Sequence, residues 1–347
     1  MKKTLIALSL VALSGAASAE VILYGQAKAG IEISQVKVNG EKSKTATEIA
    51  DFGSRIGFKG TEHLGSNLNA IWQVENSVSL AGSGKWADRD SFIGLEGGFG
   101  KVRAGKLSTQ LKDMDTLDPW EYSNPALGLG VFTRTGTREV SVRYDTPVFA
   151  GFSGNVQYSP RDNNQPSDKY THSLPNSDKY FAGLNYTNSG FFAQYGYGYK
   201  HASYTVNGDG KSGQAHRVEA GYDANNLFVG VGAQYTKGWD TSDGYLGAFN
   251  LSGGSATEGV KTKEVAVTGA YTFGNVTPRV SYAHGWAAKS NAGNAVGKYD
   301  QVVVGADYDF SKRTTALVSA GWMKLGETKY NAKAESVAGL VGLRHKF

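Results

Sequence analysis

The chain has 347 residues, no cysteine and a formal net charge of +5. The lack of cysteine excludes disulfides and Cys-ligated metal as sources of stability, and so small a net charge argues against a dedicated nucleic-acid binder. The 46 glycines, 19 tyrosines and 15 phenylalanines, beside only 7 prolines, favour many strands joined by tight turns, because helices penalise glycine and strands favour aromatic residues.

The first 19 residues have the features of a secretory signal peptide. Met1-Lys2-Lys3 precede an apolar stretch from Leu5 to Leu13 and the small residues Ala17-Ser18-Ala19. We therefore expect cleavage after Ala19 and a single mature domain, residues 20–347. No later stretch of roughly 18 apolar residues follows, so no transmembrane helix is predicted.

From residue 21 to residue 347 the sequence alternates with a period of two, which is typical of strands. In the first strand Leu23, Gly25, Ala27, Ala29, Ile31 and Ile33 share one face, and Tyr24, Gln26, Lys28 and Glu32 share the other. Residues 140–144, 265–271 and 302–308 repeat the pattern. One such strand fits a soluble sandwich with its apolar face inward, or a membrane barrel with its apolar face toward lipid.

The connections separate these two possibilities. Short turns are predicted at 62–67, 97–100, 145–150, 187–190, 223–226, 274–277 and 310–313, and longer polar connections at 34–48, 81–88, 107–138, 160–179, 201–215, 238–263, 286–298 and 324–335. Strict alternation of short and long connections predicts an all-β fold, a 16-stranded antiparallel transmembrane β-barrel with short periplasmic turns and long extracellular loops. A barrel of this size encloses an aqueous channel.

Two further features agree with a barrel in a membrane. Val337, Gly339, Val341, Leu343, His345 and Phe347 alternate in a last strand, which must pair with the first because an open edge in lipid leaves peptide groups unsatisfied. Aromatic residues near strand ends are interpreted as interfacial girdles, with a stacking platform for sugars as the alternative. They are Tyr158, Tyr186, Phe191, Phe192, Tyr222 and Phe228.

Seven segments closely resemble the neisserial PorB-type major porins, and the resemblance covers the whole chain. They are residues 23–28 (LYGQAK), 53–60 (GSRIGFKG), 70–75 (AIWQVE), 91–95 (SFIGL), 274–285, 299–313 and 341–347 (VGLRHKF). The resemblance implies a homotrimer of barrels in the outer-membrane lipid, each passing ions and small hydrophilic solutes without a cofactor. It also implies that the third long loop folds inward and narrows the lumen.

The third long connection, Leu107 to Arg138, is the candidate functional site. It carries the acids Asp113, Asp115, Asp118 and Glu121, and the strand faces expected to point inward carry the bases Lys28, Arg55, Lys59, Lys101, Arg103 and Arg143. Acids opposite bases would produce a transverse field that separates the paths of cations and anions. Lys106 resembles a constriction position of the family, although alternation from Lys101 points it outward. The alternative is that each charge is solvated or paired locally.

Other functions fit the residues less well. An enzyme needs a nucleophile oriented by a base, and none of the six histidines lies in a Gly-x-Ser-x-Gly or His-Glu-x-x-His motif. A surface adhesin that binds host surface or immune components through its polar loops could coexist with a pore. A substrate-specific channel would differ only in its loops and constriction. The inward bases outnumber the loop acids, which favours a weak preference for anions.

Overall fold

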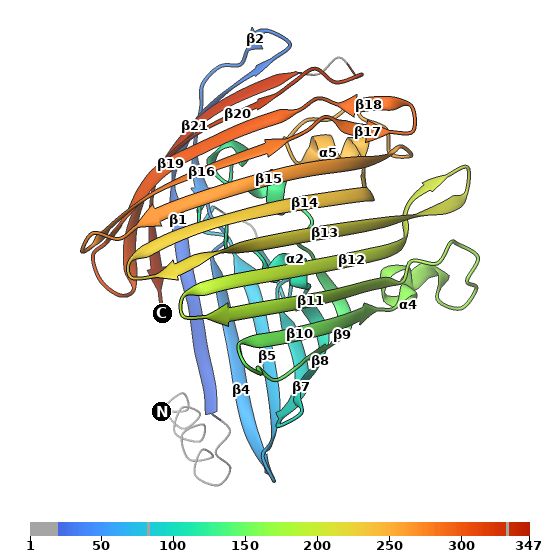
Figure 1. Cartoon of the computed structure of the whole chain (residues 1–347), viewed down its shortest axis with the longest axis vertical. Helices are drawn as coiled ribbons and strands as arrows, with labels where there is room; N and C mark the ends of the chain where they lie inside the picture. Colours follow the sequence, from blue (N-terminus) through green and yellow to red (C-terminus); the bar gives the residue numbers. More distant parts are fainter. Residues whose placement is uncertain (1–19, 82–83, 331–332) are drawn as a thin grey trace, which may run out of the picture.

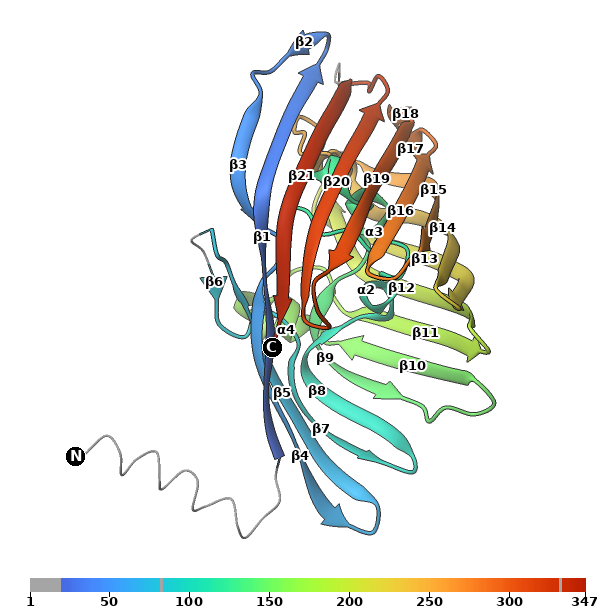
Figure 2. The same cartoon turned by 90° about the vertical axis from the view of Figure 1, so that its left-hand side faces the viewer.

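The computed structural model describes residues 20–81, 84–330 and 333–347; the predicted signal peptide, residues 1–19, lies outside them. Sixteen antiparallel strands form a closed barrel (Figures 1 and 2). They are β1 (Glu20–Val38), β4 (Arg55–Gly65) preceded by β3 (Ala46–Asp51), β5 (Leu68–Val78), β7 (Ser91–Gly97), β8 (Gly100–Ser108), β9 (Arg138–Asp145), β10 (Phe152–Ser159), β11 (Lys179–Asn188), β12 (Phe191–Val206), β13 (Asp209–Ala224), β14 (Leu227–Thr241), β15 (Gly259–Tyr271), β16 (Val276–Gly285), β19 (Tyr299–Asp309), β20 (Thr314–Leu325) and β21 (Ala334–Lys346).

The remaining elements belong to the connections. They are the strands β2 (Glu41–Lys42), β6 (Gly84–Lys85), β17 (Ala288–Ser290) and β18 (Gly293–Val296), the helices α2 (Gln110–Asp113), α3 (Gly130–Thr133), α4 (Arg161–Asn164) and α5 (Ser242–Gly247), and the 3₁₀ turns η2 (Pro125–Leu127) and η3 (Pro166–Asp168). No helix among the described residues is long and apolar enough to cross a membrane.

The first and last strands close the barrel, as predicted. β1 pairs with β21 from Gln26 opposite Lys346 to Val38 opposite Ala334. Beyond this ladder the backbones of Gly25 and Phe347 exchange two hydrogen bonds of 3.1 Å. Figure 2 shows the two strands side by side. Every barrel strand therefore has two neighbours. The sheet has no free edge strand whose peptide groups would be unpaired in lipid.

The alternation of each strand separates an outer apolar face from an inner polar face. Leu23, Ile31 and Ile33 of β1 are exposed on the outside, whereas Lys28 and Glu32 between them are buried inside. The other strands repeat this arrangement, with Val140 and Val142 of β9, and Val302 and Val304 of β19, exposed in the same way. An outer surface made of exposed valine, leucine and isoleucine is suited to lipid rather than to water.

Two of the predicted long connections are wrong in extent. The strands run through most of 34–48 and 201–215, and tight Asn-Gly turns join them, with Asn39 and Gly40 at φ 52° and 98° and Asn207 and Gly208 at φ 51° and 86°. Positive φ at both central residues fits a type I′ turn, which matches the twist of the flanking strands. The paired strands therefore extend as hairpins beyond the neighbouring strands.

The interior is not uniformly open. Leu117, Leu127, Leu129, Val131 and Phe132 of the third connection form one buried apolar cluster with residues of the barrel wall and of α5. The wall contributes Ala266, Ala283, Leu317, Met323, Ala338 and Leu340, which come from β15, β16, β20 and β21. Residues 117–132 of the third connection are therefore packed against this side of the barrel.

Candidate functional site

The third connection, residues 109–137, lies across the lumen and contacts strands on its far side. The Trp120 indole donates to the Ser281 hydroxyl at 2.8 Å, and the amide of Gln301 donates to the carbonyls of Pro125 and Gly128 at 2.7 and 2.6 Å. Ser281 and Gln301 belong to β16 and β19, which are far from the connection in sequence. Figure 1 shows α2 and the rest of the third connection inside the ring of strands.

Inward side chains of the wall satisfy backbone groups of this irregular segment. Arg217 donates to the carbonyls of Leu111 and Met114, and Glu32 accepts hydrogen bonds from the backbone amides of Ser123 and Asn124 at 2.7 and 3.1 Å. A buried backbone group without a partner is costly, so these contacts stabilise the path of the chain. The wall positions the acids by holding the backbone that carries them.

Asp113 and Glu121 form ion pairs with inward-facing bases that include the predicted Arg143 and Lys28. The Asp113 carboxylate lies 2.6 Å from the guanidinium of Arg143, which also donates to the Ser108 carbonyl at 2.8 Å. Glu121 lies between Lys28, at 2.5 Å, and Arg344, at 3.2 Å. The structure therefore brings Asp113, Glu121, Lys28 and Arg143 together in pairs. Of these, the Asp113 side chain is the most accessible, at 43 % exposure.

The other two acids have different surroundings. Asp115 forms an ion pair with Lys112 and lies 3.8 Å from Arg217. Asp118 accepts hydrogen bonds from the Tyr122 hydroxyl at 2.6 Å and the Leu129 amide at 2.9 Å, both within the connection itself. Burial raises the pKa of Asp118 to about 6 despite these hydrogen bonds. The hydrogen bonds of Asp118 are therefore made within the loop and support the loop's own fold.

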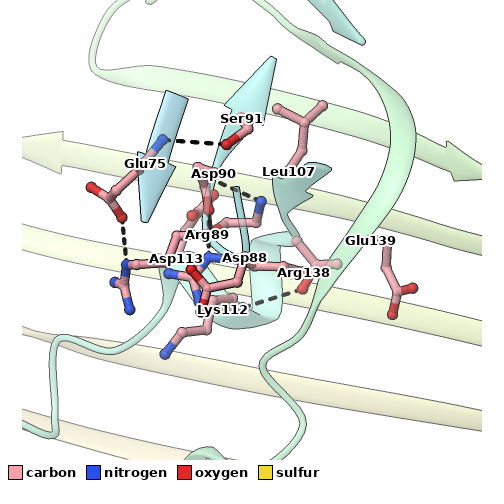
Figure 3. Close-up of polar contacts among 12 residues, drawn as sticks. Glu75, Asp88, Arg89, Asp90, Ser91, Leu107, Lys112, Asp113, Arg138 and Glu139 are labelled. Carbon is pink, nitrogen blue, oxygen red and sulfur yellow. Dashed lines mark hydrogen bonds and ion pairs between the residues drawn. The ribbon is translucent and has the colours of Figure 1, made fainter. Parts of the chain in front are cut away.

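The wall formed by β4 and β5 carries more positive than negative charge. Glu75 is shared by Arg55, at 3.4 Å, and Arg89, at 2.5 Å, so two guanidiniums surround one carboxylate. Figure 3 shows the pair of Glu75 with Arg89. Lys59 lies over the Tyr24 ring, 5.3 Å from its centroid, and has no ion pair with any described residue. On this wall the inward bases Arg55 and Lys59 therefore outnumber the inward acid Glu75.

Asp90 and Arg138 form an ion pair where the third connection joins its flanking strands. Asp90 accepts from Arg138 at 2.5 Å and from the Ser108 backbone and hydroxyl at 3.1 and 2.9 Å. Figure 3 shows Asp90 and Arg138 beside α2, close to Asp113 and Lys112. These contacts join the beginning and the end of the connection to the second long connection, residues 79–90.

The remaining predicted bases are Arg103, Lys101 and Lys106. Arg103 is directly opposite Arg143 and shares Asp145 with it, so it belongs to the same cluster as Arg143. Arg103 pairs with Asp145 at 2.7 Å, and Lys101 pairs with Glu96 at 3.6 Å, next to the short turn at 97–100. Lys106 is opposite Ser91 and Val140 in the ladders, and Val140 is 45 % exposed on the outer face. Because directly opposed residues share a face, Lys106 points away from the lumen. The alternation of the strand predicted this outward direction, whereas the family resemblance predicted a constriction position.

Several lumen residues escaped the sequence analysis. They are Glu75, Arg89, Arg134, Arg217, Arg279 and Arg344, all of which form ion pairs inside the barrel. Arg217 and Glu219 flank Val218, which is 48 % exposed, so alternation along β13 contained the signal. Arg89 and Arg134 lie in connections, where no alternation indicates direction. Among the described residues no group of three or more His, Asp or Glu side chains is arranged to hold a metal ion.

Comparison with known proteins agrees with this architecture. Residues 26–347 match the family model of the Gram-negative porins. The major outer membrane protein P.IB of Neisseria sicca is 55% identical and that of Neisseria meningitidis serogroup B is 50% identical, each over the full length of both chains. These relatives confirm the resemblance to neisserial porins.

Solved structures share the fold at low sequence identity. The anion-selective porin from Comamonas acidovorans has a TM-score of 0.71 and 20% identity, covering 95% of this chain and 100% of its own. The trimer form of OmpT of Vibrio cholerae has a TM-score of 0.67 and 14% identity, covering 95% and 99%. The chain therefore belongs to the Gram-negative porin family and is an outer-membrane channel protein rather than an enzyme.

Proposed function

We propose that this porin admits ions and small polar solutes along the side of the lumen bounded by β4 and β5, with a weak preference for anions. The observation that carries the proposal is the unequal charge of that wall. Arg55 and Arg89 share the single carboxylate of Glu75, and Lys59 has no acidic partner among the described residues. The accessible acids Asp113 and Asp115 lie on the third connection instead.

Acids on the connection and an excess of bases on the wall separate the two signs of charge across the passage. A fixed field of this kind orients polar solutes and draws anions toward one side and cations toward the other. Much of the charge is cancelled locally, as in the Asp113–Arg143 and Asp90–Arg138 pairs, so the preference is weak. We expect permeation to be passive diffusion, as in an open water-filled barrel.

The proposal is tested by the reversal potential of the porin in a planar bilayer under a salt gradient, comparing the wild type with Lys59→Glu. One unit charge changes the energy of an ion about 8 Å away in water by roughly 0.5 kcal/mol, so the two-unit change is expected to shift the permeability ratio several-fold toward cations. Lys44→Glu, an exposed position in the first long connection, is the matched control. Equal shifts in both variants would contradict a selective role for the β4 wall.

We also propose that the protein assembles as a homotrimer. The support is its membership of the porin family together with its fold similarity to OmpT of Vibrio cholerae, whose structure was determined in a trimer form. Conductance steps that arrive in groups of three, together with a trimeric mass in mild detergent, are expected. A stable monomer that conducts in single steps would contradict the proposal.

A further inference from the structure

Two tight turns at the end that carries the long connections have almost the same sequence. Val38-Asn39-Gly40-Glu41 joins β1 to β2, and Val206-Asn207-Gly208-Asp209 joins β12 to β13. They contain the two Asn-Gly dipeptides of the chain, and in both the asparagine and the glycine are exposed and have positive φ. Local sequence and turn conformation are therefore matched, so a difference in the chemistry of the two asparagines reflects their surroundings.

Contacts outside the hairpin hold the first of these turns. The Asn39 side-chain oxygen accepts a hydrogen bond from the Lys333 backbone amide at 2.9 Å, and the Asn39 backbone amide donates to the Lys333 carbonyl at 3.0 Å. β21 also pairs with β1 as far as Val38, next to the turn. The Asn39 side chain is therefore fixed to the last long connection, and these hydrogen bonds must break before it can move.

The second turn lacks this support. No described residue forms a hydrogen bond with the Asn207 side chain. Beyond an irregularity of the β12–β13 ladder after Lys200, three directly opposed pairs within residues 204–211 hold the tip. β11 pairs with β12 only as far as Lys200, and β14 pairs with β13 only as far as Gln214, so the tip projects beyond both neighbours (Figure 1). A segment with few contacts of this kind opens locally at low cost in free energy.

The Gly208 nitrogen lies next to the Asn207 side chain in the sequence and can react with it. The nitrogen attacks Cγ of Asn207 and gives up its proton, the bond from Cγ to the side-chain nitrogen breaks, and ammonia leaves a five-membered cyclic imide. Water then opens the imide at either carbonyl, which gives aspartate or isoaspartate. Amide and water thus become carboxylate and ammonium, without an oxidant or a reductant. Glycine favours ring closure because it has no Cβ to hinder the approach.

We propose that Asn207 is a site of spontaneous deamidation in this porin and that Asn39 is protected from the same reaction. Ring closure requires the turn to leave its type I′ conformation, which the free tip at Asn207 allows and the contacts between Asn39 and Lys333 oppose. The product adds a carboxylate beside Asp209, whose side chain is 77 % exposed. The isoaspartate form also inserts a methylene into the backbone of a two-residue turn. The hairpin tip therefore changes in charge and shape as each copy of the protein ages.

The test compares the two asparagines within one molecule. The purified full barrel in detergent is incubated at mildly alkaline pH, then unfolded and digested with trypsin, which releases Asn39 and Asn207 in different peptides. Mass spectrometry measures the exchange of NH₂ for OH, and chromatography separates aspartate from isoaspartate. Asn207 is expected to deamidate about tenfold or more faster than Asn39, because two hydrogen bonds must break at Asn39 before its ring can close.

The unfolded chain supplies the reference rate. In denaturant the two nearly identical sequences are expected to deamidate at similar rates, so a difference that appears only in the folded barrel comes from the structure. Equal rates at Asn39 and Asn207 in the folded barrel would overturn the proposal. An intact Asn207 in the folded barrel, over a time in which the unfolded chain reacts, would overturn it as well.

Two variants of Lys333, an exposed position, assign the protection of Asn39 to its hydrogen bond. Lys333→Pro removes the backbone amide that donates to the Asn39 side chain, so deamidation of Asn39 is expected to accelerate several-fold while that of Asn207 stays unchanged. Lys333→Ala keeps the amide and is the matched control, with both rates unchanged. No acceleration in Lys333→Pro, or the same acceleration in Lys333→Ala, would contradict the protective role of this contact.

Discussion

Arg134 provides a sharp test of how the third connection is held. Its guanidinium lies 2.6 Å from Glu264 and 2.9 Å from Asp240, and it donates to the Thr262 hydroxyl at 2.9 Å. It also lies over the Tyr245 ring of α5, 4.5 Å from the centroid. Glu264 is fully buried, so Arg134→Met leaves a carboxylate without its counter-charge. Removing one partner of a buried ion pair costs about 3–5 kcal/mol.

This cost is expected to appear as local opening of α3. The Thr133 amide donates to the Leu129 carbonyl at 2.9 Å, directly beside Arg134. If the substitution destabilises this region by about 3–5 kcal/mol, hydrogen exchange at Thr133 becomes at least about a hundredfold faster, since 1.4 kcal/mol corresponds to tenfold. Exchange would be measured on the folded porin in detergent, with amides of β10 as an internal reference.

A second variant separates loss of charge balance from loss of packing. Arg134→Met with Glu264→Gln removes the fully buried charge of Glu264 together with its counter-charge, and only Asp240, whose side chain is 17 % exposed, loses a partner. Much of the lost protection is therefore expected to return. The reasoning is refuted if Arg134→Met leaves exchange at Thr133 unchanged, or if the double variant opens as readily as the single one.

Three further predictions concern the same channel. Glu75→Gln removes the carboxylate that two arginines share, so the permeability ratio obtained from the reversal potential is expected to shift several-fold toward anions. An unchanged ratio would argue that this wall is screened from the permeating ions. Asp118 has a pKa raised to about 6 from an ordinary value of 3.8, so the closed loop binds more protons than the open one between about pH 4 and pH 6. The stability of the folded loop is therefore expected to fall as the pH rises through this window and to level off above it. In Asp118→Asn, amide exchange in the loop should show only the intrinsic dependence of exchange on pH. Gly321→Ala places a Cβ 1.8 Å from the Ala126 carbonyl oxygen, so η2 must move and channel conductance is expected to change, whereas Gly339→Ala, whose nearest contact is 3.9 Å away, should leave it unchanged.

The strand pattern of the sequence predicted most of the fold. Alternation of apolar and polar residues predicted the strands and their outward faces because lipid imposes a strict requirement on one side of every strand. The pattern failed at 34–48 and 201–215, where polar, exposed residues were interpreted as loops. The dipeptides Asn39-Gly40 and Asn207-Gly208 were the signal for extended hairpins, since both residues tolerate the positive φ of a type I′ turn.

The candidate site was less predictable than the fold. Lys28 and Arg143 were identified because alternation fixes the direction of strand side chains, and the same rule would have found Arg217. Arg134 and Arg89 could not be placed in this way, because their positions depend on the path of a connection. That path is set by contacts between residues more than a hundred positions apart, such as Trp120 with Ser281 and Arg134 with Glu264.

The apolar patch beneath the third connection has a consequence for attempts to widen the pore. Inward residues of β20 and β21 such as Leu317, Met323 and Leu340 are covered by that connection and never meet the aqueous path. Deleting residues 116–134 would uncover them and turn part of the lumen into a hydrophobic strip. Water withdraws from narrow apolar passages, and such a passage stops ions although it is wide enough for them. Enlarging this channel therefore requires polar replacements on the uncovered wall as well as a shorter loop.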